Sequence, residues 1–234
     1  MGACCQGCWR EGGLTVVVIP GEEAMAQPFG LLVAGFDYST VAEDEFNDWY
    51  DTEHIPERER IKGFINAERW LGIDRSGISI ATYDLASLDV LQSQTYRAIA
   101  GVNLSPWSKR VTGKCQRICR FEAEQLVPGN RVAPPGAGGL LLFAMNVAPE
   151  VESEFNEWYD TEHIPNLSAV PGCLSARRYR ANGGSHRYIA IYHLSSPEVC
   201  ASKTWEGAAI TKWTLKLRPY TQDRLRIPLR RYIR

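Results

Sequence analysis

A segment rich in aromatic, acidic and histidine side chains occurs twice in the chain. Residues 45–56 read EFNDWYDTEHIP and residues 154–165 read EFNEWYDTEHIP. Both copies have a histidine two residues before the final proline, His54 or His163, and the proline disfavours helical geometry in the residue before it. An imidazole in the last turn of a helix can titrate near neutrality, because the helix C-terminus favours its charged form while burial opposes it. The two histidines are therefore candidate proton-transfer groups, with helix capping as the alternative role.

A helical wheel of the segment, drawn at 100° per residue, gathers other functional side chains around each histidine. An amide and a phenol fall on the histidine's side of the wheel, next to an aromatic stripe. Such a set supplies an acid or base, hydrogen-bonding groups and apolar walls, which small-molecule pockets combine. The predicted substrate-binding residues are Asn47, Trp49 and Tyr50 in the first copy and Asn156, Trp158 and Tyr159 in the second.

The same wheel places an acidic residue in the middle of the aromatic stripe, Glu53 in the first copy and Glu162 in the second. A carboxylate among apolar side chains needs a cation nearby, or its pKa rises. Arginines occupy equivalent places on the strands expected to follow. We therefore expect structural ion pairs, Glu53 with Arg69 and Glu162 with Arg178, with a catalytic carboxylate as the alternative.

The remaining two of the four histidines distinguish the second copy from the first. His193 stands on a predicted strand where the first copy has Asp84, and His186 precedes that strand. A site that takes and returns a proton benefits from two titratable groups with separate pKa values. His163 and His193 are therefore predicted catalytic residues, and we expect His54 to contribute less.

The repeat extends well beyond the segment that carries the histidines. At the same spacing of 109 residues, Gly63 corresponds to Gly172 and Arg69 to Arg178. Hydrophobic patterns in each copy predict the order β-α-β-β-α-β, which is the ferredoxin-like arrangement. The stretch YIAIYHL is apolar on both alternating faces, so its sheet needs a cover opposite the helices. The predicted fold is α+β, with two ferredoxin-like repeats whose antiparallel sheets face each other within one chain.

Composition sets the predicted domain boundaries. A Pro/Gly-rich linker at 127–139 separates a first repeat at 29–126 from a second at 140–234. Residues 1–28 form an N-terminal extension. Because Met25 opens MAQPFGLLVAGF just before the first expected strand, most of this extension is interpreted as non-native or misassigned sequence.

The charge balance and the cysteines exclude several other classes of protein. The 26 Lys and Arg residues nearly balance 27 Asp and Glu residues, so neither nucleic acid nor an anionic membrane is an expected partner. No apolar run reaches the roughly 18 residues of a membrane span, and no secretory signal opens the chain. The seven cysteines do not match between the copies and are interpreted as reduced thiols. A cytoplasmic protein without a metal site is expected.

The motif FNxWYDTEHIP, followed by a glycine and an arginine-containing strand, resembles the dimeric α/β-barrel superfamily, particularly its EthD-like members. The resemblance covers nearly all of residues 29–234. It implies two such subunits fused into one intrachain barrel, with the helix histidines His54 and His163 as candidate proton-transfer groups. Related families include cofactor-free lactone isomerases, polyketide cyclases, quinone-forming monooxygenases, aldoxime dehydratases and haem-binding enzymes.

The leading functional prediction is a cofactor-independent acid-base enzyme of the lyase, isomerase or cyclase type. Its expected substrate is a small apolar molecule, aromatic or polyketide-like, and a cofactor-free monooxygenase is a variant of this prediction. No nucleophile motif, phosphate loop or dinucleotide fingerprint occurs. The alternatives are a haem enzyme of the same fold, because histidine is a common axial ligand, and a non-enzymatic small-molecule-binding or stress-response protein. As a pseudo-dimer the chain could be self-sufficient, and further homo-oligomers stay open.

Overall fold

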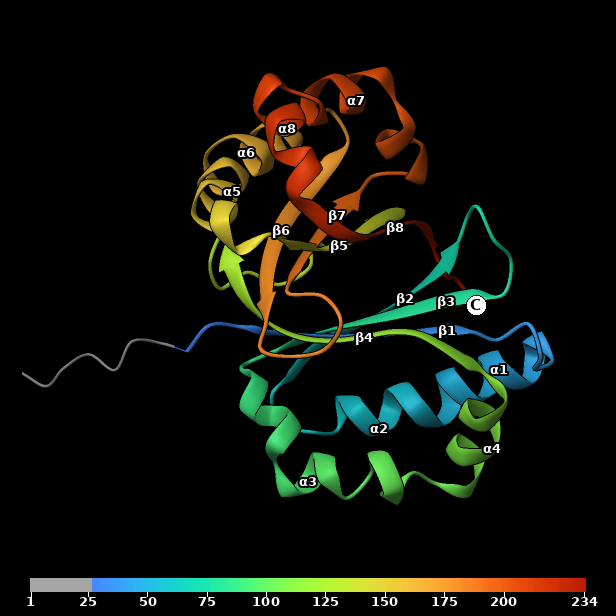
Figure 1. Cartoon of the computed structure of the whole chain (residues 1–234). Coiled ribbons are helices and arrows are strands. Elements are labelled where there is room, and N and C mark those ends of the chain that lie inside the picture. The colour runs from blue at the N-terminus through green and yellow to red at the C-terminus, as the bar shows by residue number, and fades with distance from the viewer. Residues whose placement is uncertain (1–26) are drawn as a thin grey trace, which may run out of the picture.

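Eight strands close into one antiparallel barrel in the computed structural model, which describes residues 27–234 (Figure 1). The predicted N-terminal extension lies outside these residues except for its last two positions. The N-terminal half contains β1 (Gly30–Asp37), β2 (Phe64–Gly72), β3 (Ile78–Leu85) and β4 (Gln116–Val127). The C-terminal half contains β5 (Gly139–Val147), β6 (Cys173–Ala181), β7 (Tyr188–Leu194) and β8 (Thr221–Arg231).

Helices cover the outer surface of the barrel, those of the N-terminal half at the bottom of Figure 1 and those of the C-terminal half at the top. The first group is α1 (Glu43–Trp49), the π-helical turn η1 (Tyr50–His54), α2 (Ile55–Glu59), α3 (Gln94–Arg97) and α4 (Pro106–Lys114). The second is α5 (Glu152–Trp158), the π-helical turn η5 (Tyr159–His163), α6 (Ile164–Ser168), α7 (Lys203–Ala209) and α8 (Lys212–Leu217). Short 3₁₀ turns include η6 (Pro197–Ala201) and η7 (Arg218–Tyr220). No helix in the described residues is long and apolar enough to cross a membrane.

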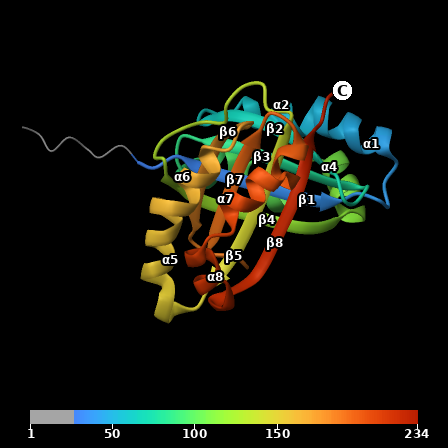
Figure 2. The same cartoon turned by 90° about the horizontal axis from the view of Figure 1, so that it is seen from above.

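The strand order around the barrel is β1-β3-β2-β8-β5-β7-β6-β4. The two sheets therefore do more than face each other, because hydrogen bonds also join their edges. Strand β2 pairs with β8, and β4 pairs with β6. Figure 2 views the barrel from above, with α5 and α8 on one side and α1 and α4 on the other.

Both faces of β7 are buried, as the doubly apolar pattern of YIAIYHL predicts. Ile189 and Ile191 of β7 point into the barrel, where they join one core shared by both halves. Tyr188 and Tyr192 alternate with them and pack under the helices of the C-terminal half. This strand alternation decides which side chains can reach a site under the helices and which cannot.

The repeated segment is not a uniform α-helix, because it passes through a π-helical turn in each half. A π turn holds about one residue more than an α turn, since its hydrogen bonds run from i to i+5. A wheel drawn at 100° per residue therefore loses register from Tyr50 and Tyr159 onward. The predicted directions of the acidic residues depended on that wheel.

The predicted ion pair between Glu53 and Arg69 is accordingly wrong. Arg69 donates to Asp51 Oδ1 at 2.7 Å and to Asn47 Oδ1 at 2.7 Å. Glu53 instead accepts a hydrogen bond from Ser108 Oγ at 3.0 Å. It lies on the side of α4, away from the strand that carries the arginine.

The predicted ion pair between Glu162 and Arg178 is wrong for the same reason. Arg178 donates to Asp160 Oδ1 at 2.6 Å and to the side-chain oxygen of Asn156, while Glu162 accepts from Thr211. In both halves an arginine of the second strand therefore holds the repeated segment through an aspartate and an asparagine.

Candidate active site

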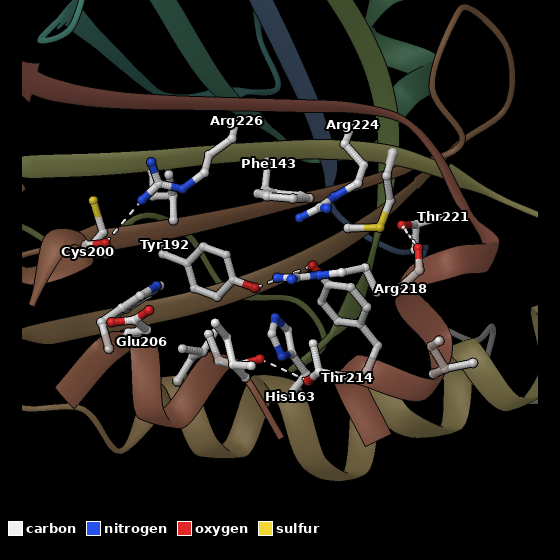
Figure 3. A pocket seen from close by; sticks show the side chains of 18 of the residues that line it. Phe143, His163, Tyr192, Cys200, Glu206, Thr214, Arg218, Thr221, Arg224 and Arg226 are labelled. Carbon is white, nitrogen blue, oxygen red and sulfur yellow. Dashed lines mark hydrogen bonds between the residues drawn. The ribbon is translucent and has the colours of Figure 1, made fainter. Parts of the chain in front are cut away.

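A cavity of about 360 Å³ lies between the sheet and the helices of the C-terminal half (Figure 3). This volume falls within the range of roughly 300–1,000 Å³ that is usual for small-molecule sites. Strands β5 and β7 provide one wall, and the repeated segment with α6, α7 and α8 provides the opposite wall. The apolar and aromatic lining includes Leu141, Phe143, Met145, Trp158, Tyr159, Leu167, Tyr192, Trp205 and Leu217.

His163 lines this cavity, as do its predicted neighbours Trp158 and Tyr159. The imidazole and the Trp158 ring have centroids 4.4 Å apart, and Tyr159 lies 5.0 Å away edge-on. Burial, with a smaller contribution from the charge of Arg178, lowers the pKa of His163 to about 4. The imidazole is therefore neutral near pH 7, and its buried Nδ1 has no hydrogen-bond partner within residues 27–234.

Two tyrosine hydroxyls meet in this cavity. Tyr192 Oη lies 3.4 Å from Tyr159 Oη, and either oxygen could be the donor. Burial raises the pKa of both tyrosines, most strongly that of Tyr192. Both phenols therefore stay protonated at neutral pH and can donate hydrogen bonds to an oxygen of a ligand. Tyr192 was not among the predicted site residues, although its place next to His193 on a strand of period two could have assigned it to the helix side.

His193 does not lie in the cavity, so the structure does not bring it together with His163. Its side chain points into the barrel, fully buried, with Nε2 at 3.0 Å from Glu68 Oε2 of the N-terminal half. Asn156, a predicted substrate-binding residue, accepts a hydrogen bond from Arg178 through its side-chain oxygen. His186 lies in the loop between β6 and β7, bonded to the carbonyl oxygen of Asp223.

The contacts of His193 belong to a buried cluster of charges inside the barrel. Arg177 donates to Asp84 Oδ1 at 2.6 Å, and Glu68 also accepts from Arg231 at 2.7 Å. Glu68 and Arg177 occupy equivalent positions in the two halves, as do Asp84 and His193. At both pairs of positions the N-terminal half supplies the acid and the C-terminal half supplies the cation or imidazole. Of these two pairs, the sequence comparison of the copies had singled out Asp84 and His193.

The other predicted site residues are packed in the N-terminal half. Trp49 and Tyr50 are fully buried, and His54 is only 9% exposed. Trp49 Nε1 donates to Ser108 Oγ at 2.9 Å, whereas the equivalent Trp158 Nε1 has no partner in the described part of the chain. Asn47 accepts from Arg69 and faces the strand. Trp49 and Tyr50 therefore form part of a hydrophobic core.

Arg58 explains much of this difference between the halves. It occupies the position equivalent to Leu167 and is buried, with 4% of its surface exposed. Burial and the nearby positive charge of Arg58 hold the pKa of His54 well below its ordinary value. A cationic side chain therefore lies near His54 where the C-terminal half has a leucine that lines the cavity.

Arginines border the cavity along β8 and η7. Arg226 donates to the carbonyl oxygen of Cys200 at 3.0 Å, and the Arg224 guanidinium lies 5.6 Å from the centre of the Phe143 ring. Arg218 completes the set, and Glu206 is the acidic residue of the lining. Among residues 27–234, no group of three histidine, cysteine or acidic side chains is arranged to hold a metal ion.

The model of a domain of unknown function, DUF4286, matches residues 140–213, which form much of the C-terminal half. No curated protein is significantly similar to the chain in sequence. Several solved structures are similar in fold. A proposed monooxygenase from Fusobacterium nucleatum is 10% identical, with a TM-score of 0.60 over 88% of this chain and 94% of that chain.

Two further structures have related shapes. An anthrone oxidase-like protein is 14% identical, with a TM-score of 0.58 over 87% of this chain and 92% of that chain. A haem-binding protein from Thermus thermophilus is 10% identical, with a TM-score of 0.55 over 88% of this chain and 92% of that chain. At these identities the likeness concerns the fold alone, and the chain has the dimeric α/β-barrel fold.

Proposed function

We propose that this protein is a cofactor-independent enzyme that moves a proton on a small aromatic or polyketide-like molecule in the C-terminal cavity. The observation that carries the proposal is a neutral imidazole, His163, in a largely apolar cavity of small-molecule size. A neutral imidazole can accept a proton, and aromatic walls can hold a planar substrate.

In the proposed step, His163 takes a proton from an acidic C–H or O–H group of the substrate. The electron pair stays on the substrate as an enolate or phenolate. The phenols of Tyr159 and Tyr192 donate hydrogen bonds to the anionic oxygen, and the bordering arginines stabilise its charge. The imidazolium then returns the proton to another atom of the substrate or to a leaving group, which distinguishes isomerases and cyclases from lyases.

A cofactor-free monooxygenase is a variant of this proposal, and two of the similar structures are described as a proposed monooxygenase and an anthrone oxidase-like protein. The substrate anion would reduce O₂ directly. In the balanced reaction a CH₂ group becomes a carbonyl, one oxygen atom enters the substrate, and the other leaves as water. The role of His163 is the same in this variant, because the substrate must first lose a proton.

We also infer that each half is a ferredoxin-like repeat and that the chain is an EthD-like fused pair. Two observations support this inference. The order of neighbouring strands is β4-β1-β3-β2 in one half and β8-β5-β7-β6 in the other. The first two strands of each half and the helical segment between them follow each other at the spacing of 109 residues that the repeated segment shows. The two repeats share a fold, but the cavity that contains His163 lies in the C-terminal repeat. We infer that the side chains of the two repeats have diverged.

Haem is the second candidate, favoured by the same histidine and by the haem-binding protein of similar fold. The side chains fit in kind, because a neutral imidazole can ligate iron and the arginines could pair with propionates. Haem would supply redox chemistry there. However, ligating histidines usually donate their second nitrogen to an acceptor, and His163 Nδ1 has no such partner in the described residues. A Soret band that appears on adding haem to the protein and is lost in His163→Ala would favour this candidate.

Hydrogen–deuterium exchange at the acidic CH₂ of anthrone, followed by NMR, tests proton transfer without assuming the later steps. We expect the protein to accelerate exchange and His163→Ala to lower the rate by about a hundredfold or more. His54→Ala is the matched control and is expected to retain most of the rate. Equal losses would mean that both halves work, and no acceleration by the wild-type protein would contradict the proposal for this class of substrate.

A further inference from the structure

The charged side chains around the C-terminal cavity are unequal in sign. Arg218, Arg224 and Arg226 line it, against the single carboxylate of Glu206. None of the three arginines makes an ion pair within 4 Å in the part of the chain that the structure describes. The edge of an otherwise apolar cavity therefore carries uncompensated positive charge.

The N-terminal half shows what a compensated arginine looks like at the same place. Arg120 of β4 lies opposite Ala34, and Arg226 of β8 lies opposite the equivalent residue, Phe143. Arg120 forms an ion pair with Glu122 and donates to Tyr96 Oη at 3.1 Å. It is therefore neutralised inside its own half.

Both partners of that arginine are replaced in the C-terminal half. The position equivalent to Glu122 lies opposite Leu141 and is Pro228, which has neither charge nor a backbone N–H. The position equivalent to Tyr96 is Trp205, which has no acceptor oxygen. Within residues 27–234, Arg226 donates to the carbonyl oxygen of Cys200 and has no carboxylate within 4 Å. The arginine is thus present in both halves, but only in the half with the cavity does it lack a carboxylate.

The arginines also have a favourable arrangement toward the cavity. In Figure 3, Arg224 and Arg226 extend from the strand at the top on either side of Phe143, while His163 rises from the helix below. A planar ring between these walls would present one edge to the guanidinium groups and another to the imidazole. A guanidinium binds a carboxylate through two parallel hydrogen bonds, which fixes orientation as well as adding affinity.

We infer that the cavity selects aromatic carboxylic acids and that Arg224 and Arg226 bind the carboxylate. This inference rests on the proposed function, whose substrate class it narrows. The carboxylate supplies the negative charge that Glu122 provides in the other half. It also anchors the ring so that the reacting atom is held at a fixed place relative to His163. Glu206 lies on the α7 side of the cavity and disfavours an anion there. The carboxylate of the ligand is therefore expected to point toward the arginines.

Binding measured by isothermal titration calorimetry tests the inference with naphthoate and its uncharged methyl ester as probes. Because both arginines are exposed and water screens their charge, we expect a moderate preference of about tenfold for naphthoate, equivalent to about 1.4 kcal/mol. Arg224→Gln combined with Arg226→Gln should abolish that preference, so that naphthoate and its ester bind with equal affinity. Arg230→Gln is the matched control, since Arg230 is an exposed arginine of the same strand outside the cavity lining.

Several results would overturn the inference. These are equal binding of acid and ester, no binding of naphthoate, a preference that survives the double substitution, or an equal loss in the Arg230→Gln control. The last would indicate a general attraction by the basic strand. None of these results depends on proton transfer, so the exchange experiment with His163→Ala can succeed while this inference fails, and the reverse.

Discussion

The two halves of the barrel carry nearly the same helical segment, but only the C-terminal copy lines the cavity described here. In the N-terminal half, Trp49, Tyr50 and His54 are packed into a core beside the buried Arg58. In the C-terminal half, Leu167 replaces that arginine, and Trp158, Tyr159 and His163 face a cavity. The comparison teaches that the repeated segment is mainly a scaffold. The side chains that face it decide whether it becomes part of a site.

The contacts of the arginines on the second strands support this view. Arg69 and Arg178 each hold an aspartate and an asparagine of the segment and lie against its aromatic rings. Two polar residues of each segment, the asparagine and the aspartate, are therefore explained by attachment of the helix to the sheet. The histidine and the tyrosine are left for chemistry, and in the C-terminal copy both His163 and Tyr159 face the cavity.

The largest expected effect comes from removing one charge of the buried cluster inside the barrel, in which the N-terminal half supplies the acids and the C-terminal half supplies the cation. Arg177→Met leaves Asp84 buried without its cation, so we expect the free energy of unfolding to fall by about 3 to 5 kcal/mol. Urea unfolding measures this loss. Arg180→Met on the same strand is the control, because Arg180 is exposed and should change stability little. A loss in Arg177→Met no greater than in the control would show that the cluster does not stabilise the contact between halves.

The next substitution makes the C-terminal half resemble the N-terminal half at one position of the cavity. Leu167→Arg places in the C-terminal half the residue that the N-terminal half has at position 58. The long cationic side chain should enter the cavity, and we expect binding of naphthoate methyl ester to weaken by about a hundredfold, or 2.7 kcal/mol. Calorimetric titration measures it, with Leu167→Met as a control of similar volume. Unchanged affinity in a folded Leu167→Arg protein would mean that the cavity is not the binding site.

Much of the fold could be predicted from the sequence, because it depends on patterns that repeat. The spacing of 109 residues and the two apolar faces of YIAIYHL were enough to predict two α+β halves with covered sheets. The closed barrel adds the edge pairs β2–β8 and β4–β6, which no local pattern encodes.

The site was predicted only in part, and the errors have physical causes. His163, Trp158 and Tyr159 were expected and do line the cavity. The pairing of Glu53 with Arg69 failed because the π-helical turn rotates Asp51 toward the strand. His193 failed because strand alternation turns it into the barrel. No pattern in the sequence shows which arginines of β8 border the cavity.

The pH dependence of stability sharpens the comparison of the two histidines. Burial lowers the pKa of His163 to about 4 from an ordinary value of about 6.5. The unfolded chain therefore takes up a proton below pH 6.5 that the folded chain accepts only near pH 4. The stabilising contribution is complete above pH 6.5 and is lost as the pH falls through this window, by at most about 1.4 kcal/mol for each pH unit.

His163→Gln should flatten this part of the stability curve, as measured by urea unfolding at a series of pH values. Carboxylates titrate in the same range, so the informative quantity is the difference between wild type and variant. His54→Gln should flatten the curve as well, because burial and Arg58 also hold the pKa of His54 low. A wild-type slope that survives in both variants would contradict the buried neutral state of these histidines.

The smallest expected effect distinguishes the two ion pairs between the second strand and the repeated segment, Arg69 with Asp51 and Arg178 with Asp160. Asp51 and Asp160 make equivalent ion pairs, but the aspartate side chain is 16% exposed in the first and 39% exposed in the second. Asp51 also accepts a hydrogen bond from Tyr232 Oη at 2.9 Å, a contact that the C-terminal half has no residue to reproduce within the described chain. Asp51→Asn should therefore reduce the free energy of unfolding by about 1 to 3 kcal/mol, as for a hydrogen bond to a charged group. Asp160→Asn should cost about 1 kcal/mol or less, because water screens the more exposed pair.

Chemical unfolding of both variants beside Glu53→Gln decides which acid pairs with Arg69. Glu53 accepts hydrogen bonds from neutral hydroxyls, so Glu53→Gln should lose less stability than Asp51→Asn. The reverse order, with Glu53→Gln the most damaging, would restore the pairing of Glu53 with Arg69. Equal losses of unfolding free energy at Asp51 and Asp160 would show that the tighter packing of the N-terminal half does not strengthen the ion pair of Arg69 with Asp51.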